Sequence, residues 1–124
     1  MKMEPIFLRQ VHPDFFKDGQ PSSQAFFPFP KDMGKLSVYD GKLISPAQSF
    51  QHYTQKLGYQ SVGVWGVSDA EVIETGLTSE PDPLPESPAH ALINFGKASE
   101  KECRKLAKKL KAFALARGVL YSPE

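Results

Sequence analysis

The chain has 124 residues, of which 40% are hydrophobic, 23% charged and 11% aromatic, and its formal net charge is +1. This balance excludes a disordered tail, a collagen-like repeat and a disulfide scaffold, and it predicts one globular domain over residues 1–124. Cys103 has no second cysteine to pair with, and no apolar run approaches the roughly 18 residues of a membrane span, so we expect a cytoplasmic protein that does not bind membranes.

Short strand patterns occur along the whole chain. Residues 6–8 predict a first strand, and residues 36–44 predict a β-hairpin, because Asp40-Gly41 supplies the positive φ angles of a tight turn. Residues 61–67 are rich in valine and carry no charge, which is typical of a strand buried on both faces. Residues 89–95 predict a further strand, and residues 119–121 a last edge strand.

Three helices are predicted by the same capping pattern, a serine followed three residues later by glutamine or glutamate. The serines are Ser45, Ser68 and Ser99. In the third helix, apolar residues recur at helical spacing and form one continuous stripe. Its members are Cys103, Leu106, Ala107, Leu110, Phe113 and Ala114. Alternating strands and helices predict an α/β or α+β fold, with a mixed β-sheet, a β-hairpin and about three α-helices.

The segment from residue 9 to residue 35 holds five of the nine phenylalanines and four prolines. Neighbouring residues of an extended chain point to opposite sides, so one ring of each adjacent pair is expected in the core and the other in solvent. The predicted partner-binding residues are Phe15, Phe16, Phe26, Phe27 and Phe29. Because no catalytic motif has a specific spacing, the favoured function is a small adaptor or accessory module that binds a protein partner or a second copy of itself.

Charge is distributed unevenly. Residues 97–117 hold eight basic and two acidic side chains, and no lysine or arginine lies between Gly58 and Gly96. A basic helix beside an acidic middle indicates internal complementarity or an acidic partner. The basic face also gives an alternative function, nucleic-acid binding, although a solvated amphipathic helix has the same pattern. The residues of this face are Lys101, Arg104, Lys105, Lys108, Lys109 and Lys111.

A second alternative is a small enzyme that acts on RNA or a nucleotide. Arg9 would hold a phosphate, while His12 and His90 would serve as acid and base, provided that the three side chains meet in one cleft. Arg9 and His12 with Ser23 and Tyr39 form a further combination, one that would suit a nucleotide such as NAD. His52 is expected on the surface of its helix.

Metal and cofactor binding are not predicted. The residues that could ligate a metal are spread through the chain without any of the spacings that metal motifs require. These residues are His12, His52, His90 and Cys103.

Overall fold

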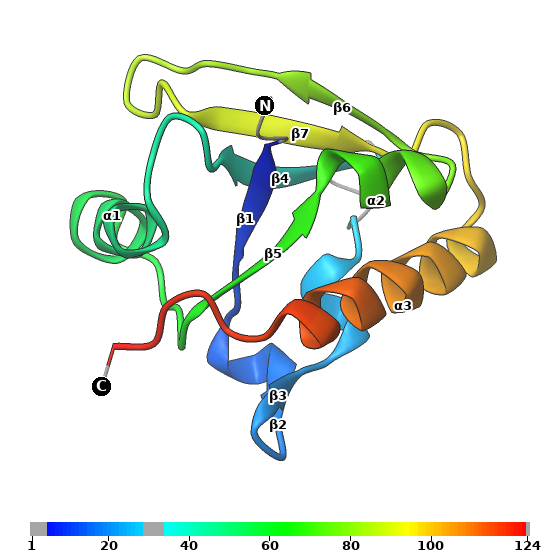
Figure 1. The fold of residues 1–124 in the computed structure, drawn as a ribbon, viewed down its shortest axis with the longest axis horizontal. Coiled ribbons are helices and arrows are strands. Elements are labelled where there is room, and N and C mark those ends of the chain that lie inside the picture. Colours follow the sequence, from blue (N-terminus) through cyan, green and yellow to red (C-terminus); the bar gives the residue numbers. More distant parts are fainter. Residues whose placement is uncertain (1–4, 29–33, 124) are drawn as a thin grey trace.

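The computed structural model of the chain describes residues 5–28 and 34–123. A five-stranded sheet forms the centre of the molecule (Figure 1). The strand order is β5-β1-β4-β7-β6, and all four pairings are antiparallel. The strands are β1 (Ile6–Gln10), β4 (Lys35–Asp40), β5 (Val64–Ser68), β6 (Thr78–Pro81) and β7 (His90–Asn94).

Three α-helices accompany the sheet, and their starts are those that the capping pattern predicts. They are α1 (Pro46–Gln51), which continues into the π-helical turn η4 (His52–Lys56), α2 (Asp69–Glu74) and α3 (Glu100–Arg117). In each of the three, the capping serine hydroxyl accepts a hydrogen bond from the third backbone amide at 3.1 Å. The glutamine or glutamate at that position bonds back to the serine amide, which completes the capping box.

The predicted fold class is confirmed as a single small domain of mixed α and β structure, but the prediction of a mixed sheet is wrong. Strands β4 and β5 run in the same direction and are joined through α1, as an alternating pattern predicts. They do not pair, because β1 lies between them and is antiparallel to both. The position of β1 is set by long-range pairing, which the local pattern does not record.

Helix α2 connects the two edge strands of the sheet and contacts both of them. Edge strands β5 and β6 are joined by nine residues, six of which are helical. A flat sheet of five strands would hold these edges about 19 Å apart. In the structure α2 contacts both β5 and β6, and the Ser79 hydroxyl donates to the Asp69 carboxylate at 2.7 Å. The sheet is therefore curled, with α2 between its edges (Figure 1).

Each face of the sheet has its own hydrophobic core. The larger core lies on the side of α3 and includes Phe7, Val38, Ile93 and Leu110. The smaller core lies on the side of α1 and centres on Leu8 and other residues of the sheet. Alternating side chains of β1 thus point to opposite cores, so the sheet separates two distinct surfaces of the molecule.

The hairpin predicted around Asp40-Gly41 is not present, because β4 ends at Asp40 and a turn leads directly into α1. Gly41 is required there for space, since a Cβ would collide with the Ile6 carbonyl oxygen. A tight hairpin turn of the predicted kind occurs instead at the other Asp-Gly pair of the sequence. Asp18 (φ 55°) and Gly19 (φ 81°) join β2 (Phe16–Lys17) to β3 (Gln20–Pro21).

Two segments, which follow α2 and α3 in the chain, lie at the edges of the sheet. Residues 77–88, which contain four prolines, supply β6 and bury Leu77 and Ser87. The predicted strand at 119–121 is reduced to one bridge, between Tyr121 and Val64. Among the described residues, no helix combines the length and apolar character that crossing a membrane requires.

Candidate binding surfaces

The strand register places His90 far from His12 and Arg9. Leu8 lies opposite Tyr39, which in turn lies opposite His90, so these three side chains share one face. Arg9 follows Leu8 and therefore points to the other face. His12 lies four residues beyond Leu8, which corresponds to about 13 Å along the strand, and two strand spacings, about 10 Å, separate β1 from β7. The structure does not bring together the three side chains of the enzyme hypothesis.

Each of these three residues instead forms a hydrogen bond with a backbone group. The Arg9 guanidinium donates to the Ala25 carbonyl at 2.7 Å and to the Ser37 carbonyl at 2.8 Å, where the pairing of β1 with β4 has ended. His12 caps the short helix η1 (Pro13–Phe15) by accepting from the Asp14 amide at 3.0 Å.

His90 bonds to Asp82 in the loop that follows β6. Its Nδ1 lies 3.0 Å from the Asp82 carboxylate and 3.1 Å from the Asp82 carbonyl. Both partners are acceptors, so Nδ1 carries the proton. The four-residue NAD combination is also divided by the sheet, because Tyr39 lies on the face opposite Arg9.

The phenylalanines of the long loop cover the larger core. Phe26 is buried, and Phe15, Phe16 and Phe27 are partly buried against the same core. None of these four side chains is exposed. The expectation that one ring of each adjacent pair faces solvent is therefore wrong. The reason is local, because η1 and η2 (Ser23–Phe26) replace the extended backbone on which that alternation depends. Phe29 lies outside the described residues.

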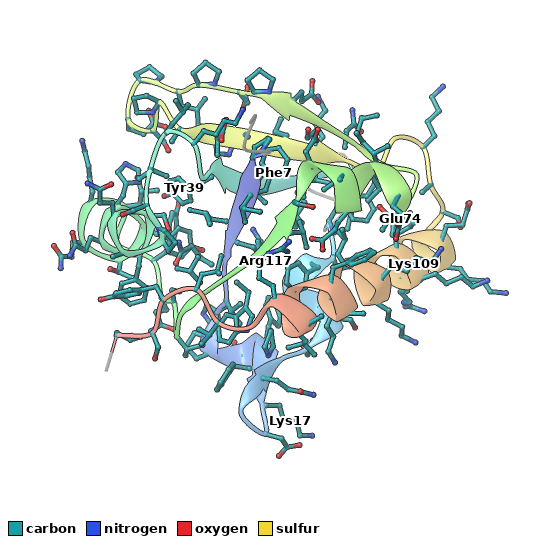
Figure 2. The ribbon with its side chains drawn as sticks, in the orientation of Figure 1. Phe7, Lys17, Tyr39, Glu74, Lys109 and Arg117 are labelled. Carbon is teal, nitrogen blue, oxygen red and sulfur yellow. The ribbon has the colours of Figure 1, made fainter. Side chains whose placement is uncertain are left out.

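The basic face of α3 is exposed as predicted. Five of its six residues are exposed and Lys111 is half-buried. At 3.6 residues per turn, the six side chains cover an arc of about 160°, opposite the buried stripe. Figure 2 labels Lys109 on this helix. Arg104 pairs with Glu100 at 3.0 Å, and the five lysines form no ion pair with the residues that the structure describes.

Among the described residues, the acidic middle of the chain forms no ion pair with this face. Glu71 pairs with Arg117 at 2.7 Å, at the end of α3 and outside the basic face. Glu80 pairs with Lys35 at 3.8 Å. In the part of the chain that the structure describes, these two are the ion pairs that carboxylates of α2 and β6 form with a lysine or an arginine.

A shallow pocket of about 320 Å³ lies on the opposite side of the sheet, and the sequence analysis missed it. The Tyr39 hydroxyl and His52 Nδ1 lie 2.7 Å apart at its base, and His52 Nε2 lies 2.6 Å from the Glu86 carbonyl oxygen. A carbonyl only accepts, so His52 carries its proton on Nε2 and accepts from Tyr39 on Nδ1. The pocket is lined by Tyr39, Leu43, Ile44, His52, Ser87, Pro88 and Ala89.

The electrostatics of this pocket oppose nucleophilic chemistry. Burial raises the pKa of the Tyr39 phenol to about 12, against a smaller lowering by its hydrogen bond with Ser87. A phenol of this kind stays protonated at neutral pH and serves as a hydrogen-bond donor. No sequence pattern marks the pocket, because its walls come from segments more than thirty residues apart.

A second hollow of about 420 Å³ lies beside the aromatic contact between Phe16 and Trp65, whose ring centres are 5.7 Å apart. Its other walls come from the end of α3 and the segment that follows it, including the exposed Val119. Among the described residues, no group of three or more potential metal ligands is clustered.

Comparison with protein-family models finds no match, and searches of curated proteins and of solved structures find none that is significantly similar.

Proposed function

We propose that this protein is a non-catalytic binding module that holds nucleic acid through the basic face of α3. The observation that carries the proposal is that six basic side chains gather on one helix face, five of them without an ion pair to a described residue, although the Glu102 carboxylate interacts electrostatically with Lys105. A concentration of net positive charge attracts a polyanion and raises its rate of association.

The composition of this face favours phosphate over an acidic protein surface. Five of the six side chains are lysines, and none is aromatic. Protein–protein interfaces are depleted in lysine and enriched in arginine and aromatic residues. Lysine acts as a point charge toward phosphate, a contact that positions nucleic acid without reading its bases. The proposed binding is accordingly independent of sequence.

The length of the face is also compatible with a nucleic-acid backbone. Lys101 and Lys111 are ten residues apart on one helix, which corresponds to about 15 Å along its axis. This length spans four to five base pairs of a duplex at roughly 3.4 Å each. Several lysines can therefore contact phosphates at the same time.

The test is a binding titration with a labelled DNA duplex at low salt. Lys105→Glu combined with Lys108→Glu should weaken binding at least tenfold. Lys17→Glu combined with Lys56→Glu changes the net charge equally through two exposed lysines outside α3, and should have a much smaller effect. An equal loss of affinity in the two double variants would show that binding depends only on net charge, and this result would contradict the proposal.

A second arm separates nucleic acid from acidic protein. Polyglutamate of similar charge should compete poorly with the duplex if phosphate is the preferred ligand. Displacement of the duplex by polyglutamate at matched charge concentration would favour an acidic protein partner instead.

A further inference from the structure

The polar groups of the Tyr39–His52 pocket are already paired with one another. Tyr39 bonds to His52 and to Ser87, and the His52 Nε2–H donates to the Glu86 carbonyl. The remaining lining is apolar and comes from Leu43, Ile44, Pro88 and Ala89. A ligand that needs hydrogen-bond donors would find few here. The pocket suits an apolar side chain.

Leu43, at the rim of this pocket, is the most exposed of the large hydrophobic side chains described, with 67% of its surface accessible. Its turn is fixed by two hydrogen bonds to Asp40, one from the Leu43 amide at 2.9 Å and one from the Lys42 amide at 2.8 Å. A projecting leucine on a fixed turn loses little conformational freedom when it is buried by a partner.

The leucine and the pocket lie on the same face, as a two-fold contact between identical chains requires. In such a contact each copy offers the same patch, so every projection must find its recess on the same surface. The neighbouring charges are also complementary. Lys42 precedes the leucine, Glu86 lies beside Ser87 at the pocket, both are exposed, and neither has an ion pair with a described residue.

We propose that this face binds a second copy of the chain, with Leu43 of each copy in the pocket of the other and Lys42 of each facing Glu86 of the other. This inference is independent of nucleic-acid binding, because Tyr39 lies on the α1 side of the sheet and α3 covers the other side (Figure 2). Either proposal can fail while the other stands.

Sedimentation equilibrium over a range of protein concentrations tests the association. The wild-type chain should show a reversible monomer–dimer equilibrium. Leu43→Asp should raise the dissociation constant at least roughly tenfold, since it places a charge where an apolar side chain was buried. Ile73→Asp is the matched control, because Ile73 is 61% exposed on α2, away from this pocket, and its replacement should leave the equilibrium unchanged.

A charge exchange tests the two-fold geometry. Lys42→Glu and Glu86→Lys should each weaken the dimer, and the double variant should restore it. Failure of the double variant to restore association would overturn the proposed pairing. A wild-type chain that stays monomeric at all concentrations, with pocket resonances that shift when indole is added, would assign the pocket to a small apolar ligand and overturn the proposal.

Discussion

Two hydrogen bonds of His52, one with Tyr39 and one with the Glu86 carbonyl, join three segments of the molecule. Tyr39 belongs to β4, His52 begins η4, and His52 also donates to the carbonyl of Glu86 in the loop before β7. The tyrosine and histidine rings meet edge to face, with centres 5.6 Å apart. This contact fixes the floor of the pocket on the α1 side.

The raised pKa of Tyr39 predicts an alkaline loss of stability. The phenol ionises near pH 10 in the unfolded chain and near 12 in the folded one, so the unfolded chain loses its proton first as the pH rises. The free energy of unfolding should therefore fall between pH 10 and about 12. Chemical denaturation at several pH values should show a smaller fall in Tyr39→Phe. An identical alkaline profile in both proteins would contradict this role.

Single residues were the level at which the sequence was least informative. Arg9 has the chemistry of a phosphate ligand, yet it donates to the carbonyls of Ala25 and Ser37. His52 was expected on the surface, but it bonds to Tyr39 and to Glu86, 34 residues further along the chain. Both outcomes depend on backbone groups that only the folded chain brings near, and the identity of the side chain carries no information about them.

Helix α3 is held by its apolar stripe, as its periodicity predicts. Cys103, Ala107, Leu110 and Ala114 are buried, while Leu106 is partly buried against the same core. Leu110→Ala should lower the free energy of unfolding by about 2–5 kcal/mol, because the side chain is fully buried and leaves a cavity. Urea denaturation measures this cost. Leu106→Ala should cost less, and the reverse order would show that the helix face is assigned wrongly.

Arg117 at the end of α3 joins this helix to the sheet edge. Its guanidinium donates to the Gly66 carbonyl of β5 at 3.2 Å and to Glu71 of α2 at 2.7 Å. Burial acts to raise the pKa of Glu71, but hydrogen bonds from Arg117 and Ser68 outweigh it and lower the pKa. The arginine also occupies a carbonyl on an edge strand that would otherwise be open to pairing with another chain.

Arg117→Ala should destabilise the fold by about 1.5–3 kcal/mol at neutral pH, the range for hydrogen bonds to charged groups. A carboxylate with a lowered pKa stabilises the fold above its unfolded value, about 4.3 for glutamate, and this contribution disappears as the pH falls through the folded value. The difference in unfolding free energy between wild type and variant should therefore shrink below about pH 4. A difference independent of pH would exclude Glu71 as the partner that matters.

Whole elements were predicted where their signals are local. The three capping boxes and the stripe of α3 lie within a few turns of helix, so sequence spacing alone defines them. The two Asp-Gly pairs show the limit of this reasoning. Both permit a tight turn, but only Asp18-Gly19 makes a hairpin, because β4 continues from Asp40 toward α1 and Gly41 packs against Ile6.

At the scale of the whole molecule, the strand order could not be predicted from the sequence pattern. The insertion of β1 between β4 and β5, and the closure of the edges by α2, depend on contacts between distant segments. This arrangement places the basic face of α3 on one side of the sheet and the Tyr39 pocket on the other. The charge asymmetry was visible in the sequence, whereas the lack of ion pairs between these lysines and described residues became visible only in three dimensions.

The salt dependence of duplex binding tests the proposed function most directly. Each lysine that contacts a phosphate contributes about −0.9 to the slope of log K against log salt concentration, so several contacts predict a slope steeper than about −3. Lys105→Ala combined with Lys108→Ala should make the slope shallower by about 2. A slope near zero, or one that this double variant leaves unchanged, would contradict a phosphate-binding role for α3.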